Sequence, residues 1–161
     1  SEHLSGVMFT TLTGTQMLHV PYKGVAQAIA DTIANEVQLT YAVVPAANPS
    51  IQGGRLRPLG VTSSKRAPLL PDVPSIAETV PGYEMLGWYS LVAQTGTPEE
   101  ILAKASADVV KIVKEPAFAE KLKSLGIDVV GGTRTDLDAF RRSQTERITE
   151  LVKAAGVDNR Q

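Results

Sequence analysis

The sequence contains no cysteine among its 161 residues. This absence excludes thiol nucleophiles, thiolate metal sites and disulfides together. It is compatible with the cytoplasm and with the bacterial periplasm, because an oxidising compartment permits disulfides without requiring them. No apolar run approaches the ~18 residues expected of a membrane-spanning helix.

Signatures of catalysis and of cofactor binding are also missing. His3 and His19 are the only two histidines, and no HExxH motif or other ligand spacing indicates a metal site. The nucleophile elbow GxSxG and the phosphate-binding loops GxxxxGKS/T and GxGxxG do not occur. We therefore predict no catalytic residue, no metal site and no cofactor.

The charges are balanced, with 16 basic and 17 acidic side chains and a net charge of -1. Nucleic-acid-binding domains usually carry a basic excess on one stripe. Here the basic clusters are pairs only, which are typical of a solvated surface: Arg55/Arg57, Lys65/Arg66 and Arg141/Arg142. A hydrophobic fraction of 43% is that of a folded globular protein, and we expect no nucleic-acid partner.

The first 62 residues alternate between helical and extended patterns. Ser1 as N-cap and Gly14 as C-terminal stop predict a helix over 1–13. The elements expected next are a strand at 17–22, a helix at 25–35, a strand at 37–44, a helical turn at 48–52 and a strand at 55–62. This order predicts a parallel sheet covered by helices. Because such a sheet normally begins with a strand, and Ser1 follows neither a start Met nor a signal peptide, we expect that preceding strands have been removed.

The remaining residues predict a proline-rich crossing followed by helices. A short helix at 75–79 and a strand at 87–93 are expected in the crossing. Thr97 as N-cap and Pro98 in the first turn predict a helix with a buried stripe from Ile101 to Val113. The last expected elements are a helix from Pro116 to the stop at Gly126, a strand at 127–130 and a helix from the cap Thr135 to Gly156.

The two histidines differ in their expected environments. His19 falls in a short strand and is expected to be a satisfied core or edge residue. His3 falls in the first turn of a helix, where free backbone N–H groups and the macrodipole favour an anion. Ser1 and His3 could add side-chain donors at this end, although the feature is also compatible with an ordinary helix start.

A series of short motifs resembles the second lobe of Bug-type (TctC-like) receptors of the tripartite tricarboxylate transporter family. Each motif is weak alone, but together they follow the family's order and spacing over nearly the whole chain. They occupy residues 20–24 (Val-Pro-Tyr-Lys-Gly), 37–41, 54–66, 70–78, 81–84, Trp88 and 96–98. The resemblance implies an α/β receptor of periplasmic-binding-protein type II, the Venus flytrap, of which this chain is the C-terminal half.

In this family a small carboxylate is bound between two lobes in the periplasm and is handed to membrane permease subunits. The resemblance thus implies a periplasmic binding protein and no enzyme. It makes residues 1–87 most of the second lobe, with the parallel sheet, and residues 88–161 the crossing strand and the C-terminal helices of the first lobe. Helices left without their sheet would expose apolar stripes, so the fragment is expected either to repack or to self-associate.

Ligand-binding positions follow from the resemblance residue by residue. Tyr22, Lys23 and Gly24 match the family's turn at the cleft, whose backbone N–H groups suit a carboxylate. Ser1 and His3 match the helix start that faces the ligand.

The chain departs from the family at two places. Many relatives carry an Asp-Asn pair where this chain has Ala42 and Val43, and an acid there would suit an amino-acid ligand. Its absence predicts a ligand without an amine, such as a dicarboxylate or an aromatic acid. Tyr89 and Ser90 replace a small glycine after the tryptophan, which alters the expected shape of the cleft.

Two other functions remain open from the sequence. One is an α/β enzyme whose catalytic residues lie in an N-terminal half. The other is a sensory receptor of the same fold, coupled to a histidine kinase instead of a permease.

Overall fold

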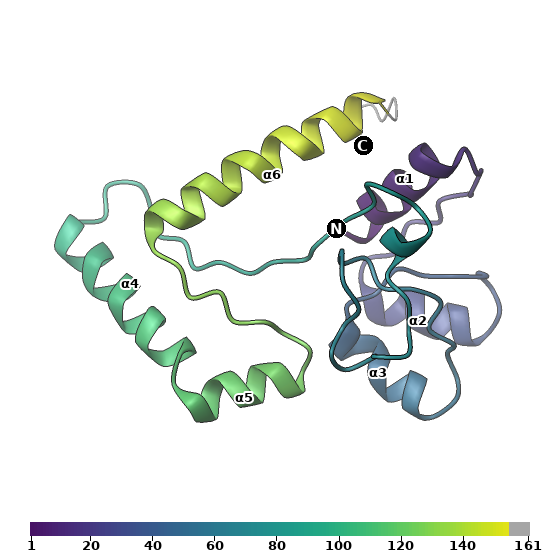
Figure 1. The fold of residues 1–161 in the computed structure, drawn as a ribbon, viewed down its shortest axis with the longest axis horizontal. Helices are drawn as coiled ribbons and strands as arrows, with labels where there is room; N and C mark the ends of the chain where they lie inside the picture. Colours follow the sequence, from purple (N-terminus) through teal and green to yellow (C-terminus); the bar gives the residue numbers. More distant parts are fainter. Residues whose placement is uncertain (155–161) are drawn as a thin grey trace. The chain divides into compact units, whose positions relative to one another are not determined.

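Six α-helices and one short 3-10 helix make up the regular structure of residues 1–154, the part of the chain that the computed structural model describes (Figure 1). They are α1 (Glu2–Thr13), α2 (Val25–Ile33), α3 (Val44–Gln52), η1 (Ile76–Glu78), α4 (Glu99–Val113), α5 (Pro116–Ser124) and α6 (Arg134–Ala154). The chain divides into two units. Ser1–Gly87 holds the first four elements, and Trp88–Lys153 holds α4, α5 and almost all of α6.

The predicted ends of α1 are confirmed. Ser1 occupies the N-cap, but its hydroxyl donates to Glu2 instead of capping the backbone. Gly14 ends the helix with φ 68°, a left-handed conformation that favours glycine, and its N–H donates to the carbonyl of Thr10 over 2.9 Å.

Helix α3 begins earlier than the sequence predicts. A strand was expected to reach Val44 and a helical turn to begin at 48, whereas the helix begins at Val44 and packs against α2. Pro45 is tolerated because a residue in the first turn has no intrahelical partner for its N–H. Pro49 lies inside the helix and removes one internal hydrogen bond, without ending it.

The expected strands do not pair into a sheet. Among residues 1–154 the only β-pairing is one parallel bridge between Val61 and Ser75. Val61 donates to the carbonyl of Pro74 at 2.9 Å, and Ile76 donates to the carbonyl of Val61 at 3.0 Å. A strand needs a neighbouring strand to satisfy its backbone, and the segments at 17–22, 37–44, 87–93 and 127–130 have none within the described chain.

The core of the first unit includes both residues of this bridge. Its buried apolar residues are Met8, Ile29, Ala47, Val61, Val73, Tyr83 and Met85, and Ser5, Ser50 and Ser75 are buried with them. Ser75 also caps η1 in a reciprocal box with Glu78, so the short helix predicted at 75–79 is confirmed. Met85 joins the core by donating its N–H to the carbonyl of Thr62 at 2.8 Å.

The helix starts of the second unit lie near the predicted positions. Pro98, not Thr97, is the N-cap of α4. Helix α6 begins at Arg134, and Thr133, not Thr135, makes the cap by exchanging hydrogen bonds with Asp136. The end predicted at Gly156 lies outside the described residues. No helix in residues 1–154 is long and apolar enough to cross a membrane.

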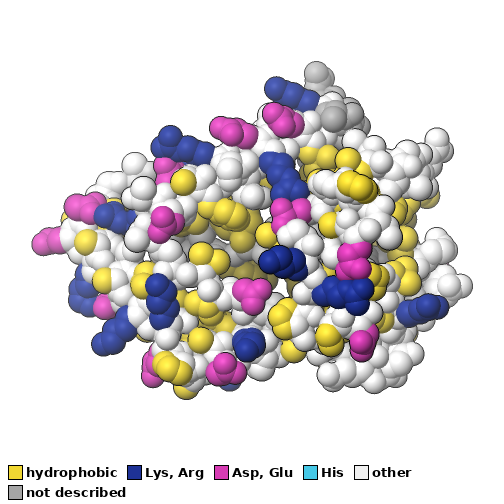
Figure 2. Space-filling view, in the orientation of Figure 1, with side chains coloured by type: hydrophobic (Ala, Val, Ile, Leu, Met, Phe, Trp, Pro, Cys, Tyr) yellow, Lys and Arg dark blue, Asp and Glu magenta, His cyan; other side chains and the backbone are white. Residues whose placement is uncertain are grey.

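The second unit has no buried residue between 88 and 153. The stripe from Ile101 to Val113 was expected to be buried, but Ile101 is 54% exposed and Ile112 49% exposed. Helix α4 packs on α5, Glu99 pairs with Arg134 at the start of α6, and the Trp88 ring meets Phe140 edge-on at 5.6 Å. These contacts leave the apolar faces uncovered because no sheet lies against them, and Figure 2 shows apolar side chains at the surface among charged ones.

Candidate functional site

The N-terminal end of α1 carries the first two candidate binding residues, Ser1 and His3. The Ser1 hydroxyl donates to a carboxylate oxygen of Glu2 at 3.0 Å, and its carbonyl accepts from both the backbone and the hydroxyl of Ser5. Both Ser1 and His3 are exposed. The first turn is therefore open to solvent on the side that carries its donors.

His3 stacks face to face on His19. The ring centroids are 3.9 Å apart and the planes differ by 5°. His19 is exposed, so the prediction of a satisfied core or edge histidine is corrected: it contacts His3 across the loop that follows α1. Partial burial, the neighbouring His19 and the terminal ammonium together lower the pKa of His3.

Tyr22, Lys23 and Gly24 lead into α2. Gly24 is the N-cap, with an extended backbone at φ -174°, and Lys23 is exposed. Tyr22 is half-buried, and partial burial followed by the carboxylates of Asp31 and Glu36 raises the pKa of its phenol. This turn presents the open N-terminus of α2 beside one cationic side chain.

Ala42 and Val43 lead into α3. Val43 is the N-cap, and its carbonyl accepts from Ala46 at 3.0 Å and from Ala47 at 3.2 Å. Both Ala42 and Val43 are half-buried. The preceding residue, Tyr41, lies against α1, where a Cβ added to Gly6 would meet its ring at 3.5 Å.

These contacts bring two of the three candidate segments to α1. The His3–His19 stack holds the segment that leads to Tyr22, and the Gly6–Tyr41 contact holds the segment that leads to Ala42. Lys23 and Gly24 take no part in these contacts. Tyr41 thus contacts α1 at Gly6, one turn beyond the helix start, and lies two residues before the N-cap of α3.

Sequence reasoning missed the buried polar residues beneath this region. Tyr83 is 1% exposed, and its hydroxyl donates to the carbonyl of Ser5 at 3.1 Å. Burial, first of all, and the neighbouring Tyr41 hydroxyl raise the pKa of Tyr83. No local pattern could reveal this contact, because Ser5 and Tyr83 are 78 residues apart in the sequence.

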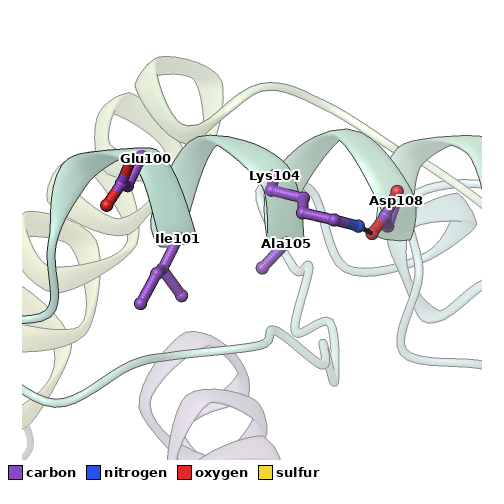
Figure 3. Close-up of a pocket in the computed structure, with 5 residues that line it drawn as sticks. All are labelled: Glu100, Ile101, Lys104, Ala105 and Asp108. Carbon is purple, nitrogen blue, oxygen red and sulfur yellow. Dashed lines mark hydrogen bonds and ion pairs between the residues drawn. The ribbon is translucent and has the colours of Figure 1, made fainter.

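A hollow of about 420 Å³ on α4 is a different kind of feature (Figure 3). It is lined by Glu100, Ile101, Lys104, Ala105 and Asp108, all exposed. Lys104 pairs with Asp108 one turn further on at 2.6 Å, so its charge is already matched. The hollow is open and shallow, and it offers a carboxylate no enclosed donors. Within residues 1–154, no group of three or more His, Cys, Asp or Glu side chains could hold a metal ion.

Comparison with known proteins adds a family match over almost the entire chain. The model of the tripartite tricarboxylate transporter family receptor matches residues 1–157. A protein from the tcbD-tcbE intergenic region of Pseudomonas sp. (strain P51) is 37% identical over 94% of this chain and 46% of its own length. One from the clcB-clcD intergenic region of Pseudomonas knackmussii is 32% identical over 94% of this chain and 91% of its own length. Most of the curated relatives that it matches are longer, and the chain spans about half of their length.

Solved structures resemble the fold closely. The structure described as R. palustris Rpa4515 with adipate has a TM-score of 0.91 and 36% identity, over 96% of this chain and 52% of that one. The periplasmic binding protein BugD has a TM-score of 0.88 and 32% identity, over 98% of this chain and 54% of its own. MatC from Rhodopseudomonas palustris with bound malate has a TM-score of 0.75 and 26% identity, over 96% of this chain and 53% of that one. The predicted fold class, an α/β receptor of the periplasmic-binding-protein type present in part, is confirmed.

Proposed function

The chain belongs to the tripartite tricarboxylate transporter receptor family. We propose that it is part of an extracytoplasmic solute-binding protein that captures a small organic carboxylate. The observation that carries the proposal is the likeness to a structure described as holding adipate, at a TM-score of 0.91 and 36% identity. A second structure, described as holding malate, has the same fold at 26% identity. Both ligands are dicarboxylates.

The binding groups that we propose lie at three helix starts. At α1 they are the free N–H groups of the first turn with the Ser1 hydroxyl and the His3 ring. At α2 they are the backbone of Tyr22 to Gly24 and the ammonium of Lys23, and at α3 the backbone at Ala42 and Val43. Helix N-termini favour carboxylates because their N–H groups are unpaired and the macrodipole is positive there.

The ligand we expect carries no amine. Ala42 and Val43 supply no carboxylate to pair with an ammonium group, and both are half-buried beside the start of α3. A buried ammonium without a counter-ion is costly, so amino acids should bind far more weakly than dicarboxylates of the same length.

The rest of the proposal concerns the whole protein. The whole protein would be located in the periplasm and would deliver its ligand to the permease subunits of the transporter. It would bind this ligand without catalysing a reaction. The sequence shows no catalytic motif, and its family and structural relatives are receptors and periplasmic binding proteins. We also propose that residues 1–161 alone self-associate through the apolar surface of the second unit.

Thermal shift and calorimetry on the full-length protein test the proposal. Adipate and malate should raise the melting temperature and bind with micromolar or tighter Kd, whereas glutamate should not. Lys23→Gln should weaken adipate binding, and Lys65→Gln, an exposed lysine in the same unit, serves as the matched control. A panel of carboxylic acids without effect, together with stabilisation by a nucleotide, would overturn the receptor function.

A further inference from the structure

A buried polar cluster links the two helix starts proposed to bind the ligand. Its centre is Tyr83, which is 1% exposed and donates its hydroxyl to the Ser5 carbonyl at 3.1 Å. Ser5 is 4% exposed and lies in α1, one turn after Ser1. The Tyr83 ring also meets Phe9 of α1 edge-on, with the centroids 6.2 Å apart. Tyr83 therefore holds α1 through both its hydroxyl and its ring.

Tyr41 connects this cluster to the start of α3. Its ring lies against Gly6 of α1, and its hydroxyl interacts with that of Tyr83. A phenol has one hydrogen, so Tyr83, while it donates to Ser5, can act only as an acceptor towards Tyr41. The next residues along the chain are Ala42 and Val43, and Val43 caps α3.

The cluster also contacts Ser1, the N-cap residue of α1. The Ser5 hydroxyl donates to the Ser1 carbonyl at 3.0 Å, beside the bond from the Ser5 backbone N–H at 2.9 Å. A continuous set of contacts thus runs from Ser1 through Ser5 and Tyr83 to Tyr41, and so to Val43. The Tyr83–Ser5 bond is buried, whereas the Ser5–Ser1 bond is only part-buried. A buried hydrogen bond holds a fixed geometry because breaking it costs free energy that water cannot restore.

We propose that Tyr83 and Tyr41 are positioning residues that set the N-terminus of α1 relative to that of α3, so that both sets of N–H groups reach one carboxylate ligand. This inference rests on the proposed function. It assigns neither tyrosine a contact with the ligand: each acts through the backbone that it fixes. Binding sites need such support, because displacing a donor by about 1 Å removes much of its contribution.

Phenylalanine substitutions separate positioning from packing, because they keep the ring and remove the hydroxyl. In the full-length protein, Tyr83→Phe removes the hydroxyl that donates to the Ser5 carbonyl and that neighbours the Tyr41 hydroxyl. The Kd for adipate should then rise about fivefold, the effect of losing one net hydrogen bond. Tyr41→Phe should also raise the Kd. In the double variant the Kd should rise by less than the product of the two single fold-changes, because the hydroxyls belong to one network.

Ser124→Ala is the matched control, because it also removes a hydroxyl that donates to a backbone carbonyl, that of Lys121, at an exposed position in the other unit. Kd is measured by calorimetry well below every variant's melting temperature and is referred to the fraction of binding-competent protein. Tyr41→Phe, at a half-buried residue, still provides the test if Tyr83→Phe does not fold. A lowered melting temperature with unchanged Kd in the tyrosine variants overturns the positioning role and leaves the receptor function standing. Failure of the wild-type protein to bind any acid of the carboxylic-acid panel, adipate and malate included, overturns both.

Discussion

Single residues decide how the segment after α1 is held. The stack of His3 on His19 joins the first turn of α1 to a segment that has no strand partner in residues 1–154. Neutral imidazoles can lie face to face at 3.9 Å, whereas two protonated rings at this distance repel each other. The contact should therefore depend on pH within the range where histidine titrates.

Acidification should weaken the structure through His3. Its pKa is lowered by partial burial and by His19, so the unfolded chain, with the usual value of 6.5, binds more protons than the folded one. Stability should fall as the pH drops from above this value to below it. Urea unfolding at pH 7.5 and 5.5 should show that His3→Gln loses less stability between the two pH values than the wild type does. Equal losses in the two proteins would show that the stack does not couple to protonation.

Gly60 is required for a close approach. A Cβ at this position would lie 2.9 Å from Cγ1 of Ile76, next to the bridge between Val61 and Ser75. Gly60→Ala should therefore cost about 1–3 kcal/mol, which is typical of overpacking. Gly87→Ala is the control, because nothing lies within 4 Å of the Cβ it would add. Equal urea midpoints for the two variants would contradict this account.

Short capped elements stabilise the first unit where a sheet would otherwise do so. Glu78 accepts from the Ser75 backbone at 2.9 Å, and its carboxylate pairs with the guanidinium of Arg66 through two hydrogen bonds. Arg66 also donates to the Pro71 carbonyl at 3.2 Å. This network holds the proline-rich segment against η1. Thr133 and Asp136 cap the start of α6 with the same kind of reciprocal side-chain bonds.

Loss of the Glu78 charge should destabilise η1 and the segment held against it. The hydrogen bonds from Arg66, then the Ser75 N–H, lower the pKa of Glu78 to about 2. Its stabilising effect should be complete above its ordinary value of 4.5 and should disappear as the pH falls through about 2. Glu78→Gln should lower the urea midpoint at pH 7, and the difference from wild type should shrink on acidification. Glu36→Gln, at an exposed position of the same unit, should have little effect; a midpoint loss as large as that of Glu78→Gln would contradict this assignment.

At the scale of the whole molecule, the two units differ in how much apolar surface they cover. The first unit buries Met8, Val61, Tyr83 and Met85, whereas the second leaves Leu91, Val92 and Val130 between 69% and 85% exposed. The solved relatives contain nearly as many residues again beyond the part that this chain matches. An apolar surface of this extent favours association.

Residues 1–161 expressed alone should therefore associate in a concentration-dependent way. Ile112→Gln combined with Phe118→Ser removes two exposed apolar side chains of α4 and α5, and should shift sedimentation towards the monomer. Glu120→Gln, at an exposed charged residue of α5, is the control. A monomer at all concentrations in sedimentation and light scattering would contradict the proposed self-association.

The helices could be predicted from sequence because their hydrogen bonds and caps are local. Ser1 and Gly14 define α1, Ser75 and Glu78 define η1, and Pro116 opens α5, all within a few residues of the bonds they affect. The family likewise followed from short motifs in a fixed order. The candidate residues at the three helix starts stay predictions.

Strand pairing and contacts between residues distant in the sequence could be seen only in the tertiary structure. The extended segments looked like strands, but a strand exists only beside a partner, and the sequence pattern of one segment does not say whether a partner lies next to it. The stack of His3 on His19 and the bond from Tyr83 to Ser5 depend on how distant segments pack. Helix ends are encoded locally, whereas the contacts that hold a helix in place are decided by non-local burial, as with Tyr83, which is 78 residues from its partner Ser5 in α1.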